Sequence, residues 1–111
     1  MELLFSYGTL QQENVQLANF GRLLRGKPDL LPNYRVGEIE ISDERVLRES
    51  GKALHAILEY TGNPQDQVAG TVFQLTEKEL ARADDYEVDD YQRVEAVLQS
   101  GLRCWIYSAA S

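Results

Sequence analysis

The segment that most constrains the fold of this chain is Thr76-Glu77-Lys78-Glu79, which carries the pattern of a helix start. The side chain of Thr76 can accept a hydrogen bond from the backbone of Glu79, and the Glu79 carboxylate can reach back to the backbone N–H of Thr76. The pattern predicts a short helix from Glu77 to about Asp85. Because strand-like stretches precede and follow this helix, it separates two parts of a mixed α+β fold.

Short apolar or alternating stretches predict six strands, at residues 3–5, 34–41, 53–61, 68–75, 91–98 and 102–107. The last two strands, joined by Ser100-Gly101, should pair as an antiparallel hairpin. Near-helical spacing of apolar residues predicts a first helix at 14–24, which the stretch 25–29 ends. The order strand, helix, three strands, helix, hairpin predicts an α+β fold, a mixed and largely antiparallel small β-barrel flanked by short helices.

The middle of the chain departs from regular alternation. The alternation of strand 34–41 slips at Gly37, which predicts a β-bulge there. Residues 42–52 are polar and predict an exposed loop, and 62–66 contain Gly, Asn, Pro and Asp, which are typical of a turn. We find no internal repeat, and 111 residues fit a single domain spanning 1–111.

Charge and composition exclude several classes of function. The chain has 18 acidic and 11 basic residues, for a net charge of −7. An acidic domain repels phosphate backbones, so we expect no nucleic-acid partner. No apolar stretch approaches the length that spans a bilayer, and the N-terminus lacks the pattern of a signal peptide, so we expect no membrane association.

Cysteine and histidine are too few to build a disulfide or a metal site. Cys104 is the one cysteine, which is consistent with a reducing compartment and predicts a cytoplasmic protein. It alternates with Leu102 and Ile106, so it should fill space in the core. His55 is the one histidine and has no partner at metal-ligand spacing, so we expect no metal and no cofactor.

The first candidate functional segment is Tyr7-Gly8-Thr9-Leu10. A strand that stops at this sequence exposes successive backbone N–H groups, and Gly8 allows conformations that other residues resist. Concave arrangements of N–H groups bind carboxylates and phosphates. A simple turn that leads into a helix is the alternative interpretation, and composition alone favours it because glycine marks turns far more often than anion sites.

The second candidate segment is the acidic run from Asp84 to Asp90. Such a run is most often a solvated loop. Here Tyr86 and Tyr91 flank the acids and supply apolar surface, and Glu87 comes just after the predicted helix. Partial burial and neighbouring carboxylates would both raise the pKa of Glu87. A carboxyl group with a raised pKa can accept and donate a proton near neutral pH.

Taken together, these segments resemble the gamma-glutamylcyclotransferase-like superfamily, in particular its small bacterial or plant-type AIG2-like branch. The resemblance is carried by four pieces that span almost the whole chain: Tyr7-Gly8-Thr9-Leu10, the Val-x-Gly-x-Val-Phe-x-Leu pattern of residues 68–75, Asp84-Asp85-Tyr86-Glu87, and Tyr91-Gln92-Arg93. None of these pieces alone identifies the family, but their combination in this order is specific for it. The chain differs from the family pattern at Val88, where Gly is frequent, and within 37–52, which lacks a Pro that is common there.

The resemblance implies a fold, a reaction and a set of site residues. It implies a compact mixed barrel and the release of 5-oxoproline from a small-molecule gamma-glutamyl substrate by intramolecular cyclisation, without cofactor or metal. It implies that Glu87 is the catalytic acid and base, and that Tyr7, Gly8, Thr9 and Leu10 hold the substrate carboxylate. The matched Tyr91 and Arg93 are assigned to substrate binding, with support of the Glu87 loop as the alternative role.

Three hypotheses for the function follow. The first is a cyclotransferase acting on a gamma-glutamyl amine or amino acid. The second is a non-catalytic module that binds such molecules on the same fold, and the third is an interaction protein that uses its acidic loop. Glu87 beside an intact Tyr7–Leu10 segment favours the first over the third, whereas an activity assay is needed to separate the first from the second. The sequence names neither the substrate nor the oligomeric state.

Overall fold

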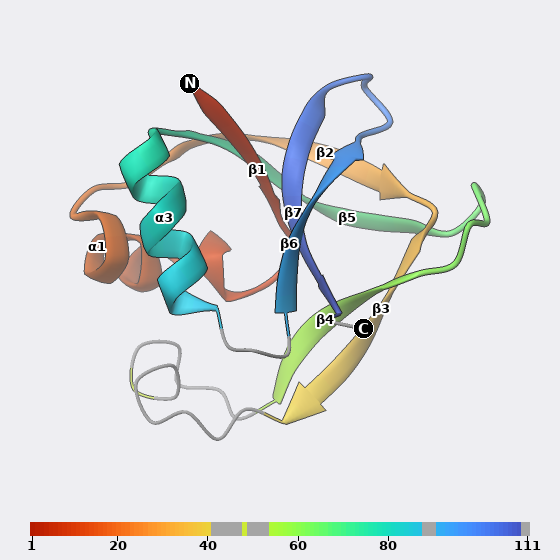
Figure 1. Ribbon diagram of the computed structural model, residues 1–111, viewed down its shortest axis with the longest axis horizontal. Helices are drawn as coiled ribbons and strands as arrows, with labels where there is room; N and C mark the ends of the chain where they lie inside the picture. Colours follow the sequence, from red (N-terminus) through yellow and green to blue (C-terminus); the bar gives the residue numbers. More distant parts are fainter. Residues whose placement is uncertain (41–47, 49–53, 88–90, 110–111) are drawn as a thin grey trace.

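A computed structural model describes residues 1–40, 48, 54–87 and 91–109 of the chain. Its elements, in chain order, are β1 (Glu2–Ser6), the 3-10 helix η1 (Thr9–Gln11), α1 (Glu13–Phe20), β2 (Arg25–Pro32), β3 (Tyr34–Glu40), β4 (Leu54–Tyr60), β5 (Gln67–Leu75), α3 (Glu77–Tyr86), β6 (Tyr91–Val97) and β7 (Arg103–Ala109) (Figure 1). The predicted α+β class is therefore confirmed.

The strands form two sheets rather than one closed barrel. Five strands are ordered β2-β5-β1-β7-β6, and β3 and β4 form a separate two-stranded sheet. The neighbours β1 and β7 run parallel, while the other pairs are antiparallel. The mixed, largely antiparallel character was predicted correctly, but the barrel was wrong, because β2 and β6 end the larger sheet at opposite edges and do not pair with each other (Figure 1).

One strand of the larger sheet was missed. The first helix was predicted to run over 14–24, but α1 ends at Phe20, and Gly21 follows with a left-handed φ of 70°. Residues 25–29, which were interpreted as a break, belong to β2 and pair with β5 from Arg25 opposite Gln74 to Pro32 opposite Gln67. A proline is tolerated within β2 because this is an edge strand, where one side of the backbone needs no partner. Pairing with β5 therefore overrides the local breaker signal.

The predicted bulge at Gly37 was also wrong. The register of β3 with β4 is continuous, with Val36 opposite Leu58, Gly37 opposite Ile57 and Glu38 opposite Ala56. The slip in alternation instead reflects an exposed apolar residue, since Val36 is 49% exposed. The predicted loop at 42–52 lies outside the described residues, apart from Arg48.

The helix start at Thr76 was predicted correctly. The Glu79 backbone N–H donates to Oγ1 of Thr76 at 3.2 Å, and the Thr76 backbone N–H donates to Oε1 of Glu79 at 2.9 Å. The Glu79 carboxylate also accepts two hydrogen bonds from Arg22, from Nε at 2.7 Å and Nη2 at 2.8 Å. These contacts tie the start of α3 to the chain just after α1, so both helices cover the same face of the larger sheet (Figure 1).

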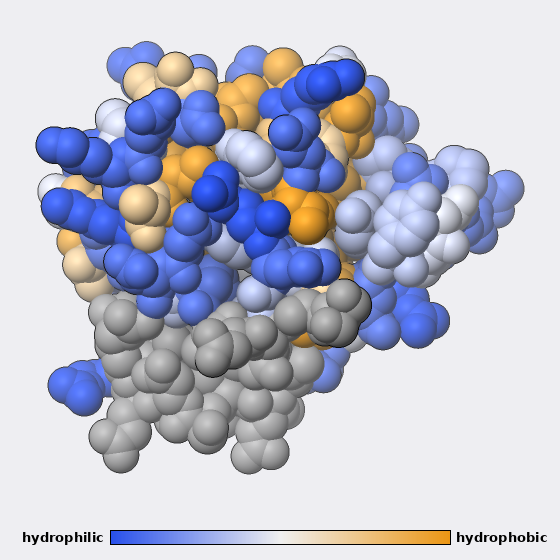
Figure 2. Space-filling model, in the orientation of Figure 1, coloured by the Kyte–Doolittle hydropathy of each residue, from blue (hydrophilic) through white to orange (hydrophobic). Residues whose placement is uncertain are grey.

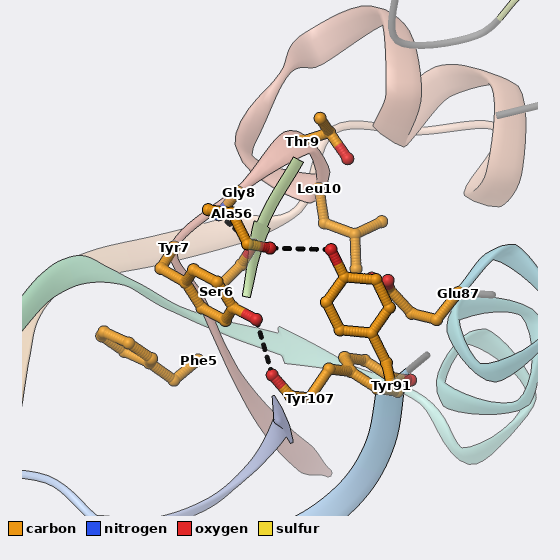
Figure 3. Close-up of a pocket in the computed structure, with 10 residues that line it drawn as sticks. All are labelled: Phe5, Ser6, Tyr7, Gly8, Thr9, Leu10, Ala56, Glu87, Tyr91 and Tyr107. Atoms are coloured by element: carbon orange, nitrogen blue, oxygen red, sulfur yellow. Dashed lines mark hydrogen bonds between the residues drawn. The ribbon is translucent and has the colours of Figure 1, made fainter. Parts of the chain in front are cut away.

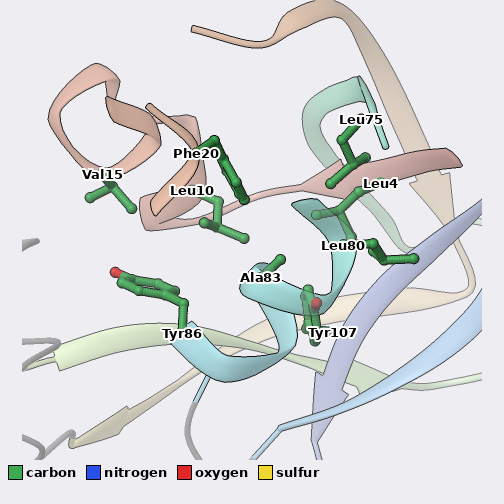
Figure 4. Close-up of a cluster of buried hydrophobic side chains, with 9 residues drawn as sticks. All are labelled: Leu4, Leu10, Val15, Phe20, Leu75, Leu80, Ala83, Tyr86 and Tyr107. Carbon is green, nitrogen blue, oxygen red and sulfur yellow. The ribbon is translucent and has the colours of Figure 1, made fainter. Parts of the chain in front are cut away.

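The core lies on both faces of the larger sheet. On the helical face, buried side chains from β1, η1, α1, β5, α3 and β7 pack together (Figure 4); they are Leu4, Leu10, Val15, Phe20, Leu75, Leu80, Ala83, Tyr86 and Tyr107. On the opposite face, Phe5 of β1 packs in a second cluster that includes Leu58 of β4. Cys104 is buried in this second cluster, so its predicted role as an apolar filler is confirmed.

Gly70 allows β5 to approach β1 next to the Tyr7 segment. A Cβ atom at this position would overlap the carbonyl oxygen of Ser6 and the ring of Phe5. Glycine is the residue that permits such a close approach of two backbones. The sheet thus fixes the end of β1, from which the first candidate segment begins. The face of the molecule in Figure 2 shows mostly polar side chains, with apolar atoms exposed in several smaller areas between them.

Candidate active site

The segment Tyr7–Leu10 forms the turn that leads from β1 into η1. Gly8 has extended angles, with φ −130° and ψ −142°, and its carbonyl oxygen accepts from the backbone N–H of Gln11 at 3.1 Å. The Gly8 nitrogen lies 3.5 Å from Oγ of Ser6, at the upper end of hydrogen-bond distance. The hydrogen bond from this N–H is therefore weak. Thr9 and Leu10 are buried, which fixes the turn against the core.

Glu87 stands at the opposite side of the same cavity. It is the residue that ends α3, with φ −72° and ψ 140°, and its backbone N–H still donates to the carbonyl of Ala83 at 3.1 Å. Its side chain and the Tyr7–Leu10 turn line one cavity of about 20 Å³ (Figure 3), together with Phe5, Ser6, Ala56, Tyr91 and Tyr107. Two segments 77 or more positions apart in the sequence therefore meet at one place.

The environment of Glu87 suits proton transfer. Burial raises the pKa of its carboxyl group from the ordinary 4.5 to about 8, and the nearby negative charge of Asp84 adds to the rise. Both causes disfavour the ionised form. A carboxyl group in this range can release and recover a proton near neutral pH, as a general acid and base must.

Tyrosines frame the cavity and hold its walls together. The Tyr7 hydroxyl donates to the backbone carbonyl of Tyr107 at 2.7 Å and accepts from the backbone N–H of Leu58 at 3.2 Å. The Tyr91 hydroxyl donates to the carbonyl of Ala56 at 2.7 Å, which joins β6 to β4. Burial raises the pKa of Tyr7 and of Tyr107 far above the ordinary value, so both stay protonated and keep their hydroxyl donors.

Arg93 lies beside the cavity rather than in its wall. It is not among the described residues that line the cavity. Its Nε lies 2.9 Å from Oδ1 of Asp84, and its guanidinium carbon stands 4.4 Å from the centroid of the Trp105 ring. The Tyr107 hydroxyl donates to the same Asp84 oxygen at 2.7 Å. The structure therefore brings together the other predicted site residues, namely Tyr7, Gly8, Thr9, Leu10, Glu87 and Tyr91, and separates Arg93 from them.

Two further tyrosines contact the predicted site residues, although the sequence interpretation did not assign them. Tyr107 lines the cavity and links it to Asp84. The hydroxyl of Tyr86, a fully buried residue, lies 2.8 Å from Oγ1 of Thr9. A signal was present for both, because a tyrosine at an otherwise apolar core position needs a partner for its hydroxyl. The sequence alone did not show which partner each would find.

Within the described part of the chain, no group of three or more His, Cys, Asp or Glu side chains could hold a metal ion. The same residues contain no helix that is long and apolar enough to cross a membrane.

Comparison with known proteins decides the family. A model of the family described as "Gamma-glutamyl cyclotransferase, AIG2-like" matches residues 4–111. The chain belongs to this family. Among curated proteins, no relative matches it.

Several solved structures have a similar fold. The Arabidopsis thaliana protein At3g28950.1 has a TM-score of 0.72 and 18% identity over 97% of this chain and 61% of that chain. At5g39720.1 from Arabidopsis thaliana has a TM-score of 0.74 and 18% identity, over 99% of this chain and 69% of that chain. A protein described as "Gamma-glutamyl cyclotransferase" has a TM-score of 0.68 and 19% identity, over 99% of this chain and 67% of that chain.

At such identities the likeness of the neighbours shows a shared fold. The chain spans less than two thirds of the length of At3g28950.1.

Proposed function

We propose that this protein is a gamma-glutamyl cyclotransferase that releases 5-oxoproline from a gamma-glutamyl amine or amino acid. The observation that carries the proposal is the cavity in which Glu87, with a pKa raised to about 8, faces the Tyr7–Leu10 turn. Membership of the family and the fold shared with a gamma-glutamyl cyclotransferase support it.

Glu87 performs the proton transfers in this proposal. The α-amine of the substrate is mostly protonated at neutral pH and must lose a proton before it can attack. The ionised Glu87 carboxylate accepts that proton. The amine nitrogen then forms a bond to its own γ-carbonyl carbon, and the bond from this carbon to the leaving nitrogen breaks. Glu87 donates this first proton to the leaving nitrogen, then carries the second proton from the new ring nitrogen to the released amine, which leaves protonated, so the enzyme ends the cycle unchanged.

The Tyr7–Leu10 turn holds the substrate in the folded conformation that cyclisation needs. Its backbone N–H groups bind the α-carboxylate. The N–H of Gly8, which makes only a weak hydrogen bond to Ser6, is one such donor. Bringing the amine and the carbonyl of one flexible chain together supplies much of the rate gain in a cyclisation. Tyr91 lines the opposite wall of the cavity and contacts the bound molecule. Arg93 supports this wall through its ion pair with Asp84.

The cavity must widen before a substrate enters. A volume of about 20 Å³ holds roughly one water molecule and is far too small for a gamma-glutamyl group. The 2.7 Å hydrogen bond from Tyr91 to the Ala56 carbonyl joins β6 to β4 across the cavity, so its opening is the local movement that would make room.

A release assay tests the proposal. The protein is incubated with a panel of gamma-glutamyl amino acids, gamma-glutamyl amines and glutathione, and 5-oxoproline is followed by mass spectrometry. We expect time-dependent product from at least one member, which also names the leaving group. The heat-denatured protein is the control for spontaneous cyclisation. If no member gives product above this control, but a member raises the temperature of unfolding, the protein is a binding module and the proposed activity is wrong.

A further inference from the structure

Three side chains form a chain of contacts behind Glu87. Asp84 lies in the last turn of α3, and Glu87 follows directly after this turn, where its backbone N–H still donates to the carbonyl of Ala83 at 3.1 Å. Oδ1 of Asp84 accepts from the Tyr107 hydroxyl at 2.7 Å and lies 2.9 Å from Nε of Arg93. The three elements α3, β6 and β7 are therefore joined at one carboxylate oxygen.

The orientation of Arg93 is itself fixed. Its guanidinium carbon lies 4.4 Å from the centroid of the Trp105 ring, a cation–π distance. The Trp105 ring is held in turn, since its Nε1–H donates to Oε1 of Glu2 at 3.1 Å. The side chains of Arg93 and Asp84 are 29% and 38% exposed, so the pair is partly shielded from solvent.

We propose that Asp84, held by Arg93 and Tyr107, is a positioning residue that sets the electrostatic environment of Glu87, with Arg93 as the counter-charge that limits its effect. This inference rests on the proposed function for its meaning in catalysis, but the arrangement can be measured without any substrate. It assigns to Arg93 an action through Asp84 in place of contact with the substrate.

The charges around Glu87 support this assignment. The phenols of Tyr7, which follows β1, of Tyr107 on β7 and of Tyr91 on β6 line the same cavity as Glu87. Phenols are uncharged near neutral pH. Among the described residues around Glu87, the nearby charge that raises its pKa is therefore that of Asp84. Burial, together with the hydrogen bond to Asp84, keeps the pKa of Tyr107 far above the ordinary value, so its hydroxyl remains a donor to Asp84.

The two members of the ion pair should act on Glu87 in opposite directions. Asp84→Asn removes a negative charge, so the ionised form of Glu87 becomes easier to reach. Arg93→Met removes the positive charge that offsets Asp84, so ionisation of Glu87 becomes harder. A merely structural role for the pair would loosen the same wall in both variants and would not separate them by sign.

The test is a direct titration of Glu87. Protein labelled with 13C-glutamate is titrated by NMR, and the Glu87 carboxyl signal is identified by its absence in Glu87→Gln. We expect a wild-type midpoint near the pKa of about 8. The midpoint should fall by roughly half a unit to one unit in Asp84→Asn and rise by a similar amount in Arg93→Met. Arg93→Lys keeps the charge and should stay nearer to the wild type than Arg93→Met.

Matched controls remove the same charges elsewhere. Asp85→Asn removes an acidic group from the neighbouring position of α3, and Arg35→Met breaks the exposed Arg35–Glu59 pair, whose Nε and Oε1 lie 3.5 Å apart. Neither should move the Glu87 midpoint. If Asp84→Asn does not fold, the comparison of Arg93→Met with Arg93→Lys carries the test alone.

The outcomes separate this inference from the proposed function. Midpoints that move in opposite directions support the inference, and the acid limb of kcat/KM should then move with them in an active enzyme. Midpoints that stay at the wild-type value, or that move in the same direction, overturn the inference even if 5-oxoproline is produced. Opposite shifts in a protein that releases no 5-oxoproline would leave the electrostatic arrangement intact and overturn the proposed function alone.

Discussion

The hydroxyl of Tyr86 lies 2.8 Å from Oγ1 of Thr9, and this buried hydrogen bond joins the end of α3 to the turn after β1. Tyr86 immediately precedes Glu87, and Thr9 belongs to the Tyr7–Leu10 turn. One contact between distant parts of the chain thus holds Glu87 and the Tyr7–Leu10 turn at the same cavity.

Removing this hydrogen bond should weaken both stability and turnover. Tyr86→Phe leaves Oγ1 of Thr9 buried without its partner, and we expect unfolding to become easier by about 1–3 kcal/mol. Turnover should fall because Glu87 and the turn are no longer held at a fixed spacing. Urea unfolding and steady-state kinetics measure the two effects.

Thr71→Val is the matched control for this contact. It removes a hydroxyl that donates to Oε1 of Gln11 at 3.0 Å, but this hydrogen bond is exposed. We expect a change in the free energy of unfolding within about 0.5 kcal/mol. A similar loss in Thr71→Val and Tyr86→Phe would contradict the role given to the buried contact.

The raised pKa of Glu87 predicts a pH dependence of stability. The folded-state pKa of about 8 lies above the ordinary 4.5, so the contribution of the protonated group is fully present below pH 4.5 and is lost as the pH rises through 8. Glu87→Gln lacks this loss. Its stability relative to the wild type should therefore increase between pH 4.5 and 9, by on the order of a few kcal/mol.

Urea unfolding of both proteins at several pH values measures this difference. Glu95→Gln, at an exposed position of β6, is the control and should change little relative to the wild type over the same range. A constant difference between Glu87→Gln and the wild type would show that Glu87 is not shielded from water as the structure indicates.

The Arg22–Glu79 pair predicts the opposite pH dependence. The hydrogen bonds from Arg22 lower the pKa of Glu79 to about 2, so its stabilising contribution is present above the ordinary 4.5 and is lost as the pH falls through 2. Arg22→Met should lower the melting temperature at pH 7 by roughly 2–5 °C, and the gap to the wild type should close on acidification. Calorimetry at pH 7 and pH 2 measures both.

Arg35→Met serves as the control for this pair, since Arg35 and Glu59 are 66% and 44% exposed as side chains and their Nε and Oε1 lie 3.5 Å apart. Exposed pairs contribute little to stability. An equal effect of Arg22→Met and Arg35→Met at pH 7 would contradict the link between the start of α3 and the chain after α1.

Gly70→Ala should disturb the site from a distance. The new methyl group would overlap the carbonyl oxygen of Ser6 and the ring of Phe5, so β1 must shift away from β5. Overpacking of this kind costs roughly 1–3 kcal/mol of stability. Because Tyr7 follows Ser6, turnover should fall as well. Ala69→Ser, at the adjacent exposed position, is the control, and the two variants should differ clearly in both measurements.

Local signals were sufficient for some of the fold. The capping box at Thr76 fixed the start of α3 because both of its hydrogen bonds form between residues three apart. The hairpin of β6 and β7 followed from alternation around Ser100-Gly101, and Val94 indeed lies opposite Ile106. In each case the interactions that form the element are close in sequence.

Other features depend on contacts that the sequence does not display. β2 exists because Arg25–Pro32 pairs with β5, more than 30 positions away, and its Gly and Pro hide that tendency. The open arrangement of the larger sheet could not be predicted for the same reason, because no local pattern shows that β3 pairs with β4 alone. Arg93 was assigned to substrate binding from its motif, and only the fold places it on Asp84.

The most direct test of the central proposal compares 5-oxoproline release by the wild type and Glu87→Gln, on the best substrate of the panel and at pH 8. The substitution keeps the size of the side chain and removes its ability to transfer a proton. We predict a loss of roughly two to four orders of magnitude in turnover, the usual contribution of a general base, in a variant that remains folded. A folded Glu87→Gln protein with a rate close to that of the wild type would contradict the assignment of Glu87.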